Sequence, residues 1–213
     1  MKTKRKALLL SLCAVLLVVA SVMGTMAYLT STDTVTNTFT VGNVQITLDE
    51  AKVNPDGTLV PNAERVKANS YKLLPGRTYI KDPTVTVKAG SEPSYVKMTV
   101  TFSKANELDA IFAPDGANLT SIFNGYNATN WIGKGNTKDA AANTRTYEFW
   151  YKETVDAPDA DVALDALFDS ITVPGSITKE QLKTIDGMTI TVNAYAIQAD
   201  GFANAEAAWV AFK

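Results

Sequence analysis

Carboxylates are the side chains best suited to chemistry in this sequence of 213 residues, because it contains no histidine and a single cysteine, Cys13. Without imidazole there can be no Ser-His-Asp triad, no Cys-His pair and no His-Glu-x-x-His zinc site. The densest acidic cluster could bind Ca²⁺, but it lacks the Asp-x-Asp-x-Asp-Gly spacing of a calcium loop, and a solvated helix face explains it equally well. The sequence therefore predicts no catalytic residue, no metal and no cofactor. The cluster consists of Asp156, Asp159, Asp161 and Asp165.

Aromatic side chains in and beside the loop-rich middle of the chain could bind a sugar or a partner protein. Core packing is the expectation for Tyr147 and Phe149, whereas Trp131 is left open between the two roles. The net charge of −2 supplies no basic surface, so no nucleic-acid partner is expected. The aromatic residues of this region also include Tyr126, Trp150 and Tyr151.

Residues 1–27 have the pattern of a signal peptide. Four basic residues between positions 2 and 6 precede an apolar run over residues 7–23, and small residues follow before Ala27. We expect a signal peptidase to cut between Ala27 and Tyr28 during export, so that contact with the membrane ends at cleavage. An uncleaved anchor is the alternative, because the apolar run is near the lower limit of spanning length.

Residues 28–42 form a β-prone segment after the predicted cleavage site. Residues 34–41 are uncharged, contain no proline and are rich in β-branched side chains. Such a segment could add to an open sheet edge through main-chain hydrogen bonds while alternate side chains fill apolar pockets. The same residues could equally form the first strand of their own domain. The side chains that share one face of this candidate donor strand are Val35, Asn37, Phe39 and Val41.

Residues 43–213 are expected to form one β-sandwich domain. Alternation of apolar and polar side chains is clearest over residues 95–102, where Lys97 is expected to face water. Turns are predicted at residues 54–57 and 73–76, which contain Pro and Gly. The core face of the clearest strand consists of Val96, Met98, Val100 and Phe102. Further strands are predicted over residues 44–48, 84–88, 145–151 and 188–197.

Short helices are expected between the strands. The i, i+3, i+4, i+7 spacing of four apolar residues predicts a surface helix after Asp161. Thr178 and Gln181 fit a capping box, and residues 203–212 indicate a closing helix or turn. Residues 113–143 are expected to be a long surface excursion. The apolar residues of the first helix are Leu164, Leu167, Phe168 and Ile171.

These elements together predict a mainly β fold, namely an antiparallel jelly-roll or immunoglobulin-like β-sandwich with short inserted helices, preceded by an N-terminal signal helix. Several blocks of sequence, in this order along the chain, also resemble the TasA/camelysin-like family of exported proteins of Gram-positive bacteria, whose signal peptides are of the SipW-processed type. These blocks are residues 26–30, residues 37–44, Leu74-Pro75-Gly76, Lys81-Asp82-Pro83 and residues 188–202.

The resemblance implies a jelly-roll-like subunit that is secreted into a biofilm matrix or onto the cell surface and assembles into fibres, with the N-terminal segment of one subunit inserted as a strand into the next. Its partners would be other copies of itself or a related matrix subunit. A monomeric surface adhesin or carbohydrate-binding module is the alternative. The metallo-endopeptidase activity associated with camelysin has little support here, because zinc in proteases usually requires histidine ligands.

Overall fold

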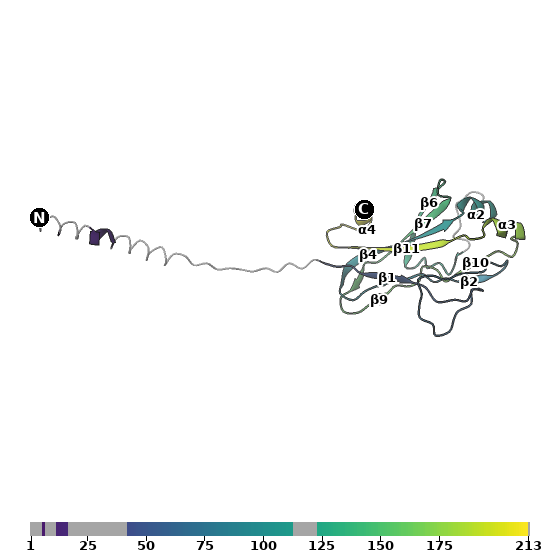
Figure 1. Ribbon diagram of the computed structural model, residues 1–213, viewed down its shortest axis with the longest axis horizontal. Helices are drawn as coiled ribbons and strands as arrows, with labels where there is room; N and C mark the ends of the chain where they lie inside the picture. Colours follow the sequence, from purple (N-terminus) through teal and green to yellow (C-terminus); the bar gives the residue numbers. More distant parts are fainter. Residues whose placement is uncertain (1–5, 7–11, 17–41, 113–122, 213) are drawn as a thin grey trace. The chain divides into compact units, whose positions relative to one another are not determined.

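The computed structural model describes Lys6 and residues 12–16, 42–112 and 123–212 (Figure 1). The chain divides into two compact units, Met1–Val41 and Gly42–Lys213. In the first unit the described residues are helical. Most of the predicted signal helix lies outside the described residues. None of the described helices is long and apolar enough to cross a membrane. Also outside the described residues are Ala27, Tyr28, Val35, Asn37, Phe39 and Val41.

The described residues of the Gly42–Lys213 unit are mainly β, and their strands pair antiparallel in three sheets (Figure 1). The largest sheet has the order β11-β4-β7-β6, and β8 pairs with the first part of β4. Its strands are β4 (Ser91–Ser103), β6 (Trp131–Asp139), β7 (Thr144–Tyr151), β8 (Val155–Ala157) and β11 (Ile190–Gln198). The two smaller sheets have the orders β1-β3-β9 and β2-β10-β5. Their strands are β1 (Ile46–Asp49), β2 (Thr78–Ile80), β3 (Thr84–Val87), β5 (Phe123–Asn124), β9 (Val162–Ala163) and β10 (Ser170–Thr172).

The core forms because β4 alternates apolar and polar side chains, which places every second residue on one face. All four residues predicted to face the core are fully buried. They share one hydrophobic cluster with Val85 and Val87 of β3, Tyr79 of β2 and Ile171 of β10. The large sheet therefore packs against the smaller sheets, and the predicted mainly antiparallel β fold with a few short helices is confirmed.

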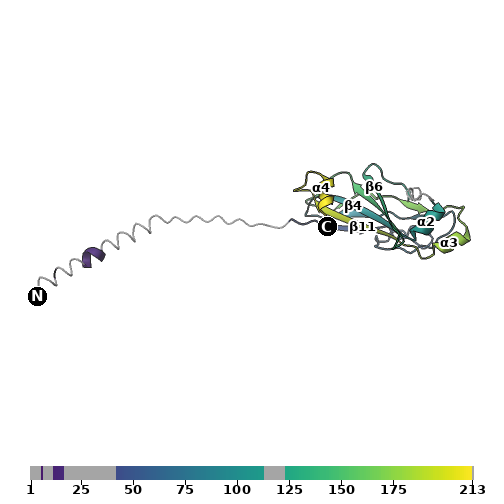
Figure 2. The same cartoon turned by 90° about the horizontal axis from the view of Figure 1, so that it is seen from above.

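Three short helices complete the described part of this unit. They are α2 (Ala105–Phe112), α3 (Lys179–Thr184) and α4 (Ala205–Ala211). The capping box predicted at Thr178 is present, because its side chain accepts from Gln181 N–H while the Gln181 side chain accepts from the Thr178 backbone. The closing helix is also confirmed, and Asn204 caps its start. Figures 1 and 2 show α2 and α3 at one end of the unit and α4 at the other.

The prediction of a helix after Asp161 is wrong. This stretch runs instead as short strands and irregular chain beside β3 and β5, with hydrogen bonds from Leu164 N–H to Val85 O (2.8 Å) and from Asp169 N–H to Asn124 O (2.9 Å). Its four apolar side chains are buried as expected. These side chains reach the core although the backbone is not helical, because pairing with neighbouring strands outweighs the helical spacing of the local sequence.

Two other expectations are wrong in part. Residues 131–139, predicted as part of a surface excursion, form edge strand β6, whose polar composition reflects the exposure of all but its first residue. Residues 113–122 of that excursion lie outside the described residues.

Lys97 does not simply face water, because its ammonium group lies 4.6 Å from the ring centroid of Trp209 on α4, and its side chain is 14% exposed.

Candidate strand-acceptor groove

A mainly apolar groove with a volume of about 1360 Å³ is lined by both β1 and β11. Side chains of Ile46 and Leu48 line it from β1, and those of Ile190 and Val192 line it from β11. The irregular segment Val66–Leu73 forms a further wall. Apolar residues of and beside α2 and α3 also line it, namely Leu108, Phe112, Leu182, Ile185 and Met188.

The edge of β11 beside this groove carries main-chain groups that no described residue pairs with. Hydrogen bonds from Ser103 N–H to Thr189 O (3.0 Å) and from Ala199 N–H to Pro93 O (2.7 Å) fix which residues of the strand bond to β4. Because antiparallel residues alternate, every second residue points its N–H and C=O away from β4. These same residues direct their side chains to the core. They are Ile190, Val192, Ala194 and Ala196.

The edge of β1 that faces the groove is open as well. Lys88 N–H donates to Gln45 O (2.9 Å), which sets the ladder with β3 so that the N–H and C=O of Ile46 and Leu48 point the other way. No described residue pairs with these groups. The open stretch ends at Glu50, whose N–H and C=O both bond to Val66 at 2.8 Å.

The two outer edges of the large sheet differ in how they are protected. Edge strand β6 carries Lys134 and Lys138, and its register shifts between Gly133 and Gly135, which are devices that discourage pairing with another chain. Edge strand β11 has the sequence ITVNAYAIQ, with no charged residue, no proline and no glycine. Of the two edges, β11 is therefore the less protected.

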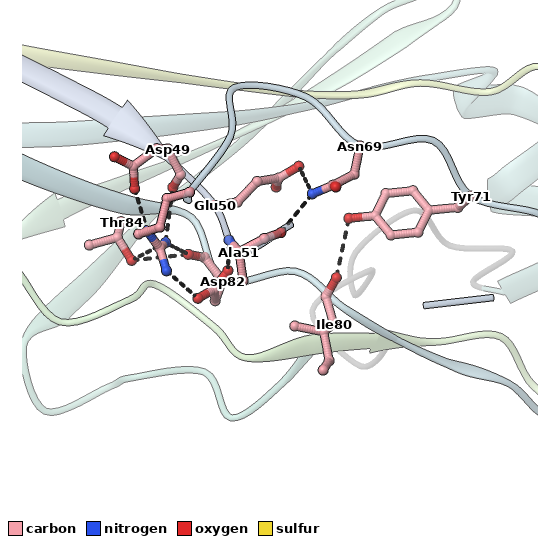
Figure 3. Close-up of polar contacts among 9 residues, drawn as sticks. Asp49, Glu50, Ala51, Asn69, Tyr71, Ile80, Asp82 and Thr84 are labelled. Atoms are coloured by element: carbon pink, nitrogen blue, oxygen red, sulfur yellow. Dashed lines mark hydrogen bonds and ion pairs between the residues drawn. The ribbon is translucent and has the colours of Figure 1, made fainter. Parts of the chain in front are cut away.

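A buried ion pair lies in the wall of the groove. Lys81 Nζ is 2.6 Å from Glu50 Oε2, and the two side chains are 8% and 9% exposed. Figure 3 shows Asn69 reaching back to the same region, where its Nδ2 donates to Glu50 Oε1 (2.9 Å) and to Ala51 O (2.8 Å). The carboxylate is thus doubly hydrogen-bonded, which offsets part of the cost of burying its charge.

The segment that forms the further wall is held by polar contacts at both ends. Arg65 donates to the carboxylates of Asp49 (2.5 Å) and Asp82 (2.8 Å). Tyr71 donates its hydroxyl to Ile80 O at 3.2 Å (Figure 3). Burial, followed by the charge of Glu50, raises the pKa of Tyr71 far above its usual range, so the hydroxyl remains a donor. This wall is therefore anchored in the domain.

The acidic cluster does not assemble into a metal site among the described residues, which contain no group of three metal-ligating side chains. Asp161 pairs with Lys88 and accepts from Ala89 N–H (2.9 Å). Asp165 accepts from the side chain of Asn130. These carboxylates therefore serve local structural contacts in separate places.

The aromatic residues of the middle region are largely core residues. Trp131 is 1% exposed, and its indole N–H donates to Asp165 O at 3.0 Å, so it does not form a surface platform. Tyr147 and Phe149 are buried as predicted, and Trp150 is buried too.

Sequence reasoning missed the polar residues of the groove, Glu50, Lys81 and Asn69. A signal for Glu50 was present, because it continues the inward phase of Ile46 and Leu48 and therefore had to point toward the core. Lys81 follows β2 directly, and the sequence around it contains no alternation of apolar and polar residues that predicts its burial.

Comparisons with family models, with curated proteins and with solved structures found no match.

Proposed function

We propose that this protein is a secreted structural subunit of extracellular-matrix or cell-surface fibres, joined by β-strand addition and without catalysis. The observation that carries the proposal is the pair of open edges, on β1 and β11, that face one apolar groove. Residues 34–41, which are uncharged and β-prone, suit the role of the strand that fills it.

Insertion into a second copy is favoured over insertion into the same chain by the residues that lead into β1. Asn43 O accepts from Glu92 N–H (2.9 Å) and Gln45 O from Lys88 N–H (2.9 Å), so this stretch is already extended beside residues 88–92. Gly42 does not have the left-handed backbone that a tight reversal would use. Only a segment folded back by a tight turn centred on Gly42 would need such a backbone.

The remaining features of the proposal follow the resemblance to the TasA/camelysin-like family. The packed antiparallel sheets would form a sandwich of the jelly-roll type rather than the immunoglobulin type. Residues 1–27 would direct export from a Gram-positive bacterium, and a signal peptidase would cleave between Ala27 and Tyr28. The expected partner is another copy or a related matrix subunit.

The first test compares the chain beginning at Tyr28 with one beginning at Gly42, both at equal concentration. We expect fibres by electron microscopy for the longer chain and monomers by light scattering for the shorter one. If the shorter chain polymerises equally well, strand donation by residues 28–41 is wrong. A longer chain that stays monomeric would favour the adhesin alternative, which a glycan array would then examine.

A second variant blocks the acceptor edge and leaves the donor intact. Ala194→Pro removes an N–H that points away from β4 and places a proline ring on the open edge of β11. We expect this variant to fold, as judged by cooperative thermal unfolding, and to lose fibre formation. Casein cleavage that is sensitive to chelators and persists through purification would contradict the absence of catalysis.

A further inference from the structure

We propose that the side chains of Lys81 and Asn69 become joined by an amide bond within the folded chain, with Glu50 as the group that moves the protons and with release of ammonia. The cross-link is a self-modification that does not depend on strand addition. The arrangement of these three polar side chains, which come from three different segments of the groove wall, carries the inference.

The carboxylate of Glu50 lies between an amine and an amide. Lys81 Nζ is 2.6 Å from Glu50 Oε2, and Asn69 Nδ2 is 2.9 Å from Glu50 Oε1. Figure 3 shows the Asn69 side chain directed at the Glu50 carboxylate. One oxygen therefore contacts the nitrogen that would attack, and the other contacts the nitrogen that would leave. This is the placement that a general acid–base group needs in order to take a proton from one and give it to the other.

The Asn69 amide is held in a single orientation. Its Oδ1 accepts from Val53 N–H at 3.0 Å, and its Nδ2 donates to Ala51 O at 2.8 Å as well as to Glu50. Exchanging the oxygen and the nitrogen would set donor against donor and acceptor against acceptor. The N–H of Val53 thus points at the oxygen that gains negative charge when the amide carbon is attacked, which is the role of an oxyanion-hole donor.

Burial and main-chain bonds keep the reacting groups together. The side chains of Lys81 and Glu50 are 8% and 9% exposed, and Glu50 is the one acceptor that Lys81 Nζ contacts among the described residues. Lys81 N–H donates to Asp169 O at 3.0 Å, and Glu50 is bonded through both main-chain groups to Val66. Well-oriented groups in one molecule react as if at about 10⁵–10⁸ M, which compensates for the low reactivity of an amide toward an amine.

The reaction balances without any further reactant. Glu50 Oε2 takes a proton from the Lys81 ammonium group, and the lone pair that this frees forms the bond from Nζ to Asn69 Cγ. The Cγ–Nδ2 bond breaks, and its electron pair leaves with Nδ2. Of the two protons that Nζ loses, one goes to Nδ2, which departs as ammonia, and one stays on Glu50. Two buried charges disappear in the process, which favours the product.

The product would tie the Val66–Leu73 wall of the groove to the chain that follows β2. It closes a loop over residues 69–81 and thereby restricts the unfolded chain, as a disulfide does. The sequence has a single cysteine, Cys13, so it cannot form a disulfide within the chain. The amide bond would supply this kind of covalent support instead.

The test is mass spectrometry of the folded chain beginning at Tyr28. We expect an intact mass that is lower than the mass of the sequence by one molecule of ammonia. Trypsin should not cut after Lys81, and it should release residues 68–72 joined to residues 78–88 as one branched peptide. The full sequence mass after prolonged incubation of the folded chain would overturn the proposal. Loss of ammonia with the two peptides separate would overturn it too, because the change would then lie elsewhere.

Variants assign the roles of the side chains. Lys81→Arg keeps the positive charge but lacks the attacking amine, and Glu50→Gln lacks the proton-transfer group, so we expect both to keep the full masses of their sequences. Lys72→Arg is the matched control, since it makes the same change at an exposed lysine of the same wall, and it should still lose ammonia. Thermal unfolding checks that each variant folds. A folded Glu50→Gln chain that forms the branched peptide as fast as the unmodified chain would contradict the role of Glu50.

Discussion

Single residues in this protein matter most where charge is buried. The ammonium group of Lys81 and the carboxylate of Glu50 lie in a groove wall that is otherwise mainly apolar, so each charge has the other as its counterion there. Exposed pairs such as Lys88 with Asp161 have water as an alternative partner and contribute much less.

We therefore expect Lys81→Met to lower the free energy of unfolding by about 3–5 kcal/mol, because it leaves Glu50 buried without its counterion. Urea denaturation of the chain beginning at Tyr28 would measure this. Lys88→Met is the matched control, with the same side-chain change at an exposed pair, and we expect a much smaller effect. Equal losses for the two variants would contradict the special role of the buried pair.

A second buried charge lies in α2, outside the groove. Burial alone would raise the pKa of Asp109, but hydrogen bonds from Arg145 (2.6 Å) and Lys138 (2.8 Å) lower it below the usual range. The folded state therefore keeps this carboxylate charged at a pH where the unfolded chain has begun to bind a proton. Its contribution to stability is complete above the unfolded pKa and is lost as the pH falls through the folded pKa.

We accordingly expect the stability of the domain to fall on acidification below about pH 4, the ordinary aspartate range. Asp109→Asn should be less stable at neutral pH and should show a shallower decline over the acidic range. Thermal unfolding at a series of pH values would measure both slopes. Parallel curves for the two proteins would show that Asp109 does not carry this pH dependence.

At the scale of elements, the short helices depend on their caps. Helix α3 spans six residues, none of them buried, and it begins with reciprocal hydrogen bonds between Thr178 and Gln181. A helix this short is not stable by itself in water, so the cap and the contacts of the neighbouring chain must hold it. Leu182 packs against the core from this helix.

Thr178→Ala should lower the free energy of unfolding by about 1 kcal/mol, because it removes the acceptor for Gln181 N–H. Thr178→Ser retains a hydroxyl at the same position and should restore most of the loss. Chemical denaturation of the three proteins side by side would measure the difference. Equal loss in the serine variant would mean that the methyl group, rather than the cap, carries the effect.

At the scale of the whole molecule, the proposed subunit has two separate parts that take part in assembly, namely a donor segment and an acceptor groove. A chain that begins at Gly42 retains the Gly42–Lys213 unit, including the groove, and lacks the donor. It should therefore bind to the end of a growing fibre that exposes a donor segment, and it has no donor segment of its own to insert into the next subunit.

We expect small amounts of the chain beginning at Gly42, mixed with the chain beginning at Tyr28, to shorten fibres in proportion to the fraction added. Electron microscopy of fibre lengths would measure the effect. The Gly42 chain carrying Ala194→Pro is the matched control, because it lacks the donor and also has a blocked edge, and it should leave the lengths unchanged. Shortening by both proteins would show that the acceptor edge of β11 is not involved.

Patterns that depend on local geometry could be predicted well. The alternation in residues 95–102 and the capping box at Thr178 reflect periodicities of one strand and one helix turn, and both agree with the structure. The helix predicted after Asp161 failed although its spacing was helical, because its apolar side chains reach the core from a chain held by β3 and β5. Local spacing decides which residues become buried more reliably than it decides the backbone path.

The sequence by itself determined that this protein is mainly β and that its strands bury one face, since these properties follow from the side chains of short stretches. Only the tertiary structure decided which edges remain open. Strand β11 pairs with β4, and β1 pairs with β3, through registers that join residues far apart in the chain. Because an open edge is defined by the neighbour a strand lacks, it becomes visible only when all the neighbours are in place.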